Sequence, residues 1–153
     1  MSGMTRKLAN FAADLSYDDL PAEVVERTKL LIFDITGVMV RARHDAESTA
    51  SMISAVERLG LASGDCSVMG DPRAYAPTAA ALVNGTLAHS LDFDDTHAAG
   101  SLHSSAPIVP AALAAAEMAG SSGRDLIAAC VVGYEVQIRL ALALNPSEHY
   151  DRG

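Results

Sequence analysis

The apolar part of this sequence consists mainly of alanine and aliphatic residues, and this feature restricts the possible fold most strongly. Half of the residues are hydrophobic, yet only 5% are aromatic and tryptophan is absent. Alanine has the highest intrinsic helix propensity because it loses no side-chain entropy on ordering. A chain of 153 residues is also long enough to bury a core. The composition therefore predicts an all-α, alanine-rich multi-helix fold, with residues 1–153 forming a single domain.

Apolar periodicity and helix-breaking residues divide the first half of the chain. We expect a short helix over residues 8–15, a long helix from Pro21 to about residue 43, and a third helix over residues 46–59. Glycine and proline punctuate residues 63–77, which predicts a loop containing at most one short strand, Cys66-Ser67-Val68-Met69.

The second half shows clearer helix boundaries. Residues 78–89 predict one helix, and an alanine-rich run to residue 119, closed by a glycine, predicts another. Ser122 and Asp125 have capping-box spacing and are expected to open a last helix, which should stop at residues 145–146, an Asn-Pro pair.

The formal net charge of −8 argues against nucleic acid as a partner, because binding a phosphate backbone requires a basic patch on the protein. We expect no membrane span, because the most apolar run, residues 30–40, is interrupted by Asp34 and falls short of about 20 residues. Asp34 itself is interpreted as a hydrogen-bonded or rim residue in preference to a buried functional carboxylate. Cys66 and Cys130 are isolated and no targeting segment is visible, which favours a reduced, cytoplasmic protein.

The polar stretch from residue 89 to residue 103 is the candidate site for chemistry. It holds three carboxylates and three imidazoles where one predicted helix ends and the next begins: His89, Asp92, Asp94, Asp95, His97 and His103. Asp92 and Thr96 would share one face if the segment stayed helical. We select His103 and Asp92 as the strongest candidates. Asp94 and Asp95 can equally be helix caps, His89 is expected to be a packed or capping residue, and His97 can simply be exposed.

The position of His103 suggests a chemical role. It would lie just before the N-terminus of the alanine-rich helix, where backbone N–H groups and the hydroxyls of Ser104 and Ser105 could receive a carboxylate. The positive end of that helix would favour a neutral imidazole, which can accept a proton. This arrangement could hold an acid and move a proton on it.

A metal centre is the alternative chemistry for a cluster of aspartates and histidines. No pair here has the HExxH spacing, and the aspartates lack the glycine and terminal glutamate of an EF-hand. We therefore expect no bound metal, and we keep a metal-dependent hydrolase as the less favoured reading.

The sequence NGTLAHSLDFDDTH over residues 84–97, followed by Leu102-His103-Ser104, resembles the MmgE/PrpD family, the 2-methylcitrate dehydratase family. The similarity continues through Gly133-Tyr134-Glu135-Val136 and runs from about residue 8 to the end. The resemblance implies a cofactor-independent lyase or isomerase acting on small polycarboxylates such as 2-methylcitrate, by dehydration, decarboxylation or epimerisation. It also implies a helical domain joined to a smaller lid domain, usually in a homodimer.

Carried over by motif, Asp92, Thr96 and His103 would line the active site, and we take them as the catalytic residues. We add Ser104 and His97 as expected substrate contacts. The resemblance covers only the N-terminal part of the family, so a second active-site histidine, a lysine and the lid domain are expected outside this sequence. We therefore expect a fragment or split subunit that self-associates or needs a complementing C-terminal chain. The alternative is a catalytically inactive helical module with a dimerisation or regulatory role.

Overall fold

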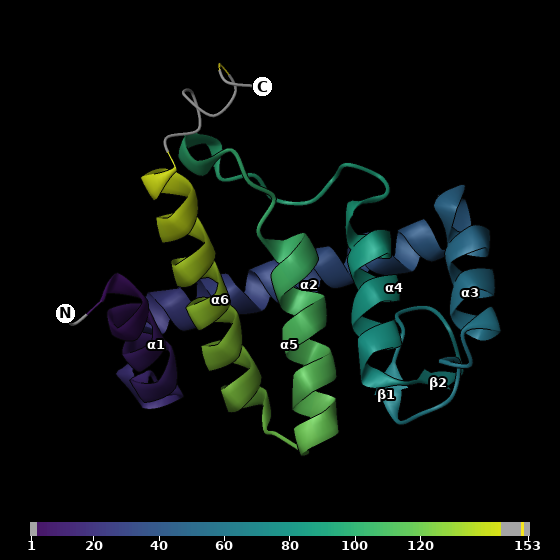
Figure 1. The fold of residues 1–153 in the computed structure, drawn as a ribbon, viewed down its shortest axis with the longest axis horizontal. Helices are drawn as coiled ribbons and strands as arrows, with labels where there is room; N and C mark the ends of the chain where they lie inside the picture. Colours follow the sequence, from purple (N-terminus) through teal and green to yellow (C-terminus); the bar gives the residue numbers. More distant parts are fainter. Residues whose placement is uncertain (1–2, 145–150, 152–153) are drawn as a thin grey trace.

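The computed structural model describes residues 3–144 and 151 and confirms the all-α fold class. Within these residues there are six α-helices, two short 3-10 turns and one sheet of two short strands. In Figure 1, α4, α5 and α6 stand side by side with alternating direction, and α2 crosses behind them. The loop that joins α4 to α5 passes over one end of this layer (Figure 1).

The three helices of the first half agree with the predicted periodicity to within a turn at most boundaries. They are α1 (Met4–Asp14), α2 (Ala22–Asp45) and α3 (Ser48–Arg58), with a 3-10 turn, η1 (Tyr17–Asp19), between the first two. The start of α1 was predicted four residues too late, because its exposed first turn carries no apolar pattern. Asp34 is exposed on α2, which agrees with its interpretation as a rim residue.

The segment between α3 and α4 contains a strand pair rather than a single strand. β1 (Cys66–Ser67) pairs antiparallel with β2 (Ala74–Tyr75), in the register that places Cys66 opposite Tyr75. The side chains of Cys66 and Tyr75 are buried in the core. The second strand was not predicted, because two residues are too few to show an alternating pattern.

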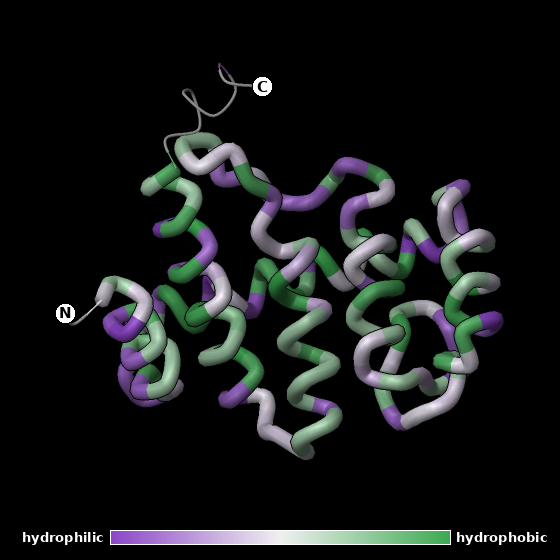
Figure 2. Tube along the Cα trace, in the orientation of Figure 1, coloured by the Kyte–Doolittle hydropathy of each residue, from purple (hydrophilic) through white to green (hydrophobic). Residues whose placement is uncertain are grey.

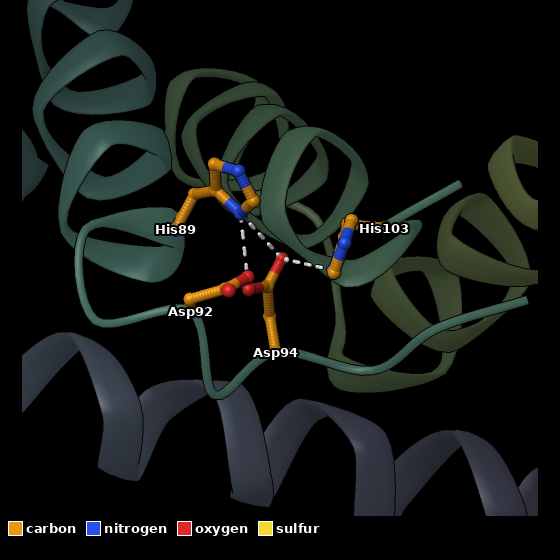
Figure 3. A group of neighbouring side chains, drawn as sticks. All are labelled: His89, Asp92, Asp94 and His103. Carbon is orange, nitrogen blue, oxygen red and sulfur yellow. Dashed lines mark hydrogen bonds and ion pairs between the residues drawn. The ribbon is translucent and has the colours of Figure 1, made fainter. Parts of the chain in front are cut away.

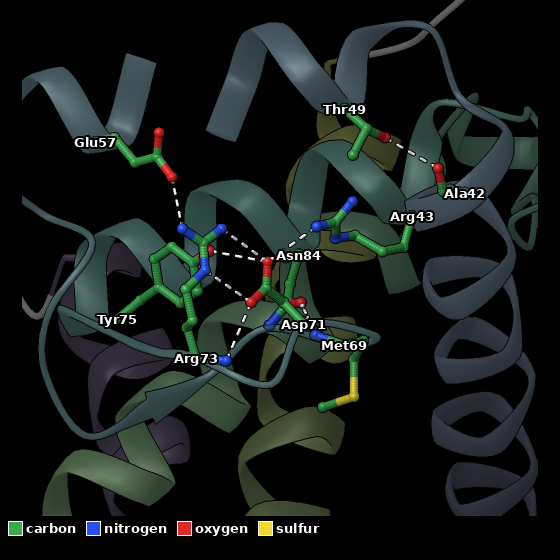
Figure 4. Close-up of polar contacts among 9 residues, drawn as sticks. All are labelled: Ala42, Arg43, Thr49, Glu57, Met69, Asp71, Arg73, Tyr75 and Asn84. Atoms are coloured by element: carbon green, nitrogen blue, oxygen red, sulfur yellow. Dashed lines mark hydrogen bonds and ion pairs between the residues drawn. The ribbon is translucent and has the colours of Figure 1, made fainter. Parts of the chain in front are cut away.

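An ion-pair network centred on the buried carboxylate of Asp71 holds this hairpin against the helices (Figure 4). The Asp71 side chain is only 1% exposed and accepts hydrogen bonds from Arg43, Arg73 and the Tyr75 hydroxyl, each at 3.0 Å. Arg73 also reaches Glu57 on α3, at 2.5 Å. The hydrogen bonds from Arg73, above all, hold the pKa of Asp71 well below its usual range. Asp71 therefore joins the hairpin to α2 through Arg43, and Arg73 extends the network to Glu57 of α3.

Asn84 gives the same hairpin a second attachment, to α4. Its side chain is buried, and its Oδ1 accepts from the Met69 N–H at 2.8 Å (Figure 4). Its Nδ2 donates to the Ser67 carbonyl at 2.8 Å. Both groups of the amide are therefore used to pair the backbone of an irregular segment, as burial requires.

The second half folds into α4 (Pro77–His89), α5 (Ser105–Ala119) and α6 (Gly123–Ala143), with a 3-10 turn, η2 (Ala98–Gly100), in the connection between α4 and α5. The helices end near their predicted boundaries. The predicted stop of the last helix at residues 145–146 lies outside the described residues. A Cβ placed on Gly133 of α6 would lie 2.7 Å from the Ile108 side chain of α5, so the glycine permits a close approach of these two helices.

The α6 helix is long and apolar enough to cross a membrane by length and composition. In this structure it packs against α5 and α2, and it carries the charged residues Arg124, Asp125, Glu135 and Arg139. Core helices pass the same length and composition test, so this feature is weak support for a membrane span.

Hydrophobic residues are distributed along the facing helices, while hydrophilic residues gather in the loop that follows α4 (Figure 2). The core lies chiefly between α2, α4 and α5, where Ile35, Met39, Val83, Leu87 and Val109 are almost fully buried. The polar loop is thus held at the edge of a packed core, and its side chains form the candidate site.

Candidate active site

The polar loop begins where α4 ends, and it is not helical. The N–H of Asp92 bonds to the carbonyl of His89, and Asp92 then adopts the left-handed conformation with φ +54°. An aspartate tolerates this region better than most residues, at a cost of order 1 kcal/mol. Asp92 and Thr96 therefore do not share a helical face, because the segment does not stay helical and α4 stops before either residue.

Four polar side chains converge at this end of the molecule (Figure 3). They come from the last residue of α4, the loop, and the residue that closes the loop, and each offers a nitrogen or oxygen atom within 4.8 Å of the others: His89, Asp92, Asp94 and His103. The two imidazole rings lie 5.0 Å apart, centre to centre, with an angle of 59° between their planes. We call this set the His–Asp cluster.

Asp94 lies at the centre of the His–Asp cluster. Its side chain is fully buried, and both of its oxygens lie 3.0 Å from Nδ1 of His89. Nδ1 of His103 lies 3.4 Å from Oδ2 of the same carboxylate, without hydrogen-bond geometry. Asp92 and His89 are exposed and His103 is half-buried, so the cluster has one face toward solvent.

Asp95 caps α5, as one of the two sequence interpretations held. Its Oδ1 accepts the N–H of Ser105 at 2.9 Å, and its Oδ2 accepts the Tyr134 hydroxyl at 3.2 Å. The same hydroxyl contacts the Ser105 hydroxyl, and burial raises the pKa of the Tyr134 phenol. The Ser105 N–H at the start of α5 thus donates to Asp95 and is not free for the substrate carboxylate that was expected there.

An open groove of about 560 Å³ lies between α4 and α5, beside the His–Asp cluster. The two histidines form part of its wall, and most of the other wall residues are apolar. The complete wall consists of Ala81, Leu82, Gly85, Thr86, His89, Ser90, His103, Ala106 and Pro107. Its size is in the range of small-molecule sites. Among the residues that the structure describes, this wall contains neither lysine nor arginine.

The remaining predicted site residues lie outside that wall. Thr96 is exposed on the loop. His97 starts η2, and its Nδ1 accepts the Gly100 N–H at 3.0 Å, which gives it a structural contact. Ser104 is fully buried with no hydrogen-bond partner for its hydroxyl in the described structure. Of the predicted residues, the structure therefore brings together Asp92 and His103, while the roles of Thr96, His97 and Ser104 stay predictions.

Two members of the cluster were not selected from the sequence. His89 was read as a packed or capping residue and Asp94 as equally a helix cap, because neighbouring identical side chains in one loop look equivalent in a linear pattern. The five-residue separation of His89 and Asp94 across a helix end was the available signal, since it allows a side chain from the loop to fold back on the last helical turn.

The His–Asp cluster also contains the nitrogen and oxygen ligand types that zinc prefers. His89, Asp92, Asp94 and His103 would be its ligands. However, atoms up to 4.8 Å apart are more widely spread than ligands about 2 Å from one zinc ion permit, so the side chains would have to close in. The arrangement suits proton exchange as it stands.

A profile of the MmgE/PrpD N-terminal domain matches residues 6–152. The cis-aconitate decarboxylase-like protein oryM of Aspergillus oryzae is 35% identical over 98% of this chain and 32% of its own length. The cis-aconitate decarboxylase of Aspergillus terreus is 33% identical over 99% and 32%, and the human cis-aconitate decarboxylase is 35% identical over 92% and 30%. The chain spans about a third of the length of these curated relatives. It belongs to the MmgE/PrpD family and matches the family's N-terminal domain.

Proposed function

We propose that this chain supplies the proton-transferring part of a cofactor-independent active site for a small polycarboxylate, such as cis-aconitate or 2-methylcitrate. The observation that carries the proposal is the convergence of two imidazoles and two carboxylates beside an open groove of about 560 Å³. An imidazole exchanges protons near neutral pH, and proton exchange next to a carboxylate is common to dehydration and decarboxylation of such acids. The relatives named as cis-aconitate decarboxylases favour that substrate class.

In this proposal His103 is the proton acceptor or donor and Asp92 is the second reacting group at the solvent-facing side of the cluster. Thr96, His97 and Ser104 are proposed contacts that become available when substrate and the rest of the enzyme are present. Catalytic hydrogen bonds often tighten only in the substrate complex, which allows for the present distances.

The described part of the chain lacks cationic groups that could bind a polycarboxylate at the candidate site. Two carboxylates in the cluster, and a net charge of −8, repel a polycarboxylate, and neither lysine nor arginine lies in the described cluster or groove wall. Carboxylate binding ordinarily relies on charge-assisted bonds from such cations. We therefore propose that the cations come from a complementing C-terminal polypeptide and that this chain alone binds substrate weakly.

An exposed apolar face on α2 agrees with a missing partner. Leu30, Phe33 and Val40 are exposed there, and Phe93 in the polar loop helps line a groove beside Phe33. Contiguous exposed apolar surface marks interaction sites. We propose that a second copy or the complementing polypeptide covers this face, which also supports the alternative function as a dimerisation module.

The test is an assay of this chain alone and mixed with the polypeptide encoded next to it. Itaconate formation from cis-aconitate and 2-methylaconitate formation from 2-methylcitrate would be followed separately, with His103→Ala as the variant and Lys7→Ala, an exposed residue of α1, as the control. We expect activity only in the mixture, with loss in His103→Ala and retention in Lys7→Ala. Light scattering reports whether the same mixture forms a complex.

Equal activity of His103→Ala and the unsubstituted mixture would refute the proposed role of His103. A stable complex without activity on either acid would favour the inactive module. A monodisperse monomer that binds no added polypeptide would contradict the proposed use of the exposed α2 face.

A further inference from the structure

We infer that Asp94 is a positioning residue that holds both His89 and His103 with the proton on Nδ1, which leaves Nε2 of His103 free to exchange a proton with substrate. The catalytic consequence rests on the proposed function, whereas the protonation pattern is a property of this chain alone. Asp94 is not among the residues that the family resemblance places in the active site.

Asp94 is buried beside the two histidines. Its side chain is fully buried, and its polar partners among the described residues are the two imidazoles, with no arginine, lysine or backbone N–H. A buried carboxylate without such partners is costly, and removing it from water requires compensating donors. The histidines are therefore the groups that must supply those donors.

The contact with Asp94 determines which nitrogen of His89 carries the proton. An ionised carboxylate only accepts hydrogen bonds, so Nδ1 of His89, 3.0 Å from both Asp94 oxygens, must carry a proton. In the neutral ring, a proton on Nδ1 leaves Nε2 without one. Asp94 consequently selects one of the two neutral forms of His89.

His103 faces the same carboxylate. Its Nδ1 is buried, has no hydrogen-bond partner in the described structure, and lies 3.4 Å from Oδ2 of Asp94. A lone pair on that nitrogen would face the carboxylate, whereas an N–H would be attracted to it and could close the contact by a small ring rotation. The preferred proton position is again Nδ1, and Nε2 remains available as an acceptor.

This arrangement has a chemical use in the proposed reaction. A buried aspartate that accepts from one ring nitrogen of a histidine fixes the ring's orientation and tautomer, and it stabilises the imidazolium formed when the other nitrogen takes a proton. In dehydration of 2-methylcitrate, a C–H proton next to a substrate carboxylate would pass to Nε2 of His103, the electron pair left on the carbon would form the new double bond, and the hydroxyl on the adjacent carbon would leave as hydroxide. In decarboxylation of cis-aconitate the proton would move the other way: CO2 would leave, the electron pair of the broken C–C bond would shift the double bond, and protonated Nε2 of His103 would give its proton to carbon.

The inference is tested on this chain without substrate. Histidine-specific ¹⁵N labelling and long-range ¹H–¹⁵N spectra, at about pH 8 where ordinary histidines are neutral, report which ring nitrogen carries the proton. His89→Gln and His103→Gln assign the signals among the five histidines of the chain. We expect a protonated Nδ1 and a bare Nε2 in both rings. A proton on Nε2 with a bare Nδ1 in His103 would overturn the inference.

A variant series tests whether Asp94 is the cause. The amide of Asp94→Asn replaces one acceptor by a donor, so we expect the Nε2-protonated form to appear in at least one of the two rings. Asp94→Glu retains an acceptor-only carboxylate and should keep the proton on Nδ1. Asp65→Asn removes an exposed carboxylate elsewhere, and as the matched control it should leave both tautomers unchanged. Unchanged tautomers in a folded Asp94→Asn, checked by circular dichroism, would overturn the role of Asp94. If that variant does not fold, the unsubstituted chain decides the question.

Activity separates this inference from the proposed function. In an active mixture, Asp94→Asn should lower kcat by at least about tenfold with little change in KM, since the substrate does not touch Asp94. The expected tautomers without activity on either acid would leave the inference standing and the proposed function refuted. Activity with the opposite tautomers would refute the inference alone.

Discussion

The attachment of the hairpin to α4 predicts a measurable loss of stability when Asn84 is replaced by leucine. Leucine has a similar volume, so the main change is the loss of two hydrogen bonds of 2.8 Å, to Met69 and Ser67. Each bond contributes about 1 kcal/mol net, and an unpaired, half-buried Met69 N–H adds about 1 kcal/mol. The free energy of unfolding should therefore fall by about 3 kcal/mol, which corresponds to roughly 6–12 °C in Tm for a chain of this size.

The measurement is thermal and urea unfolding followed by circular dichroism, with Thr86→Val as the control on the same helix. The Thr86 hydroxyl donates only to the Leu82 carbonyl of its own helix, at 2.9 Å, so its loss should cost less than about 0.5 kcal/mol. If the two variants melt within about 2 °C of each other, the Asn84 bonds contribute no more than an ordinary helix-surface contact and the reasoning is refuted.

Two further predictions concern buried ionisable groups. The lowered pKa of Asp71, caused above all by Arg73, stabilises the fold fully above the ordinary aspartate pKa of about 3.9, and this contribution is lost as the pH falls through the lowered folded value. At pH 7 the free energy of unfolding of Asp71→Asn should therefore be lower by about 2–3 kcal/mol, and below about pH 4 it should fall less steeply than that of the unsubstituted chain. Parallel acid-unfolding curves of the two proteins would contradict this. Burial raises the pKa of Cys130 to about 11 and also raises that of Cys66, so iodoacetamide at about pH 8 should alkylate the native chain far more slowly than the unfolded chain, as counted by mass spectrometry. Equal rates in the two states would show that the thiols are accessible.

Helices with strong local signals were predictable from the sequence. The capping box formed by Ser122 and Asp125 is present at the start of α6, and Gly120 adopts the left-handed conformation with φ +62° that ends α5. Such signals depend on residues within a few positions of one another, so a linear pattern contains them. The pairing of Cys66 with Tyr75 depends on the Asp71 network instead, and no local pattern specifies it.

The candidate site was predictable as a segment but not as a geometry. Residue types and spacing identified the polar loop, and a helix start just after His103 was expected and is observed. Which aspartate faces the histidines was not specified, because Asp94 and Asp95 are adjacent and differ only in the direction taken by the loop backbone. The structure directs Asp95 to the Ser105 N–H and Asp94 to the imidazoles.

That division between adjacent aspartates follows from what each can reach. Asp95 accepts from a backbone N–H and a tyrosine hydroxyl, which are present whatever the state of the site, so its charge is stabilised permanently. Asp94 depends on two imidazoles, whose protons can move, so the stability of its buried charge is coupled to their protonation. A proton delivered to His103 makes the pair with Asp94 stronger, and a proton removed from it makes the pair weaker. The loop thus separates a carboxylate that holds α5 in place from one that responds to proton transfer, and only the second is suited to assist a reaction.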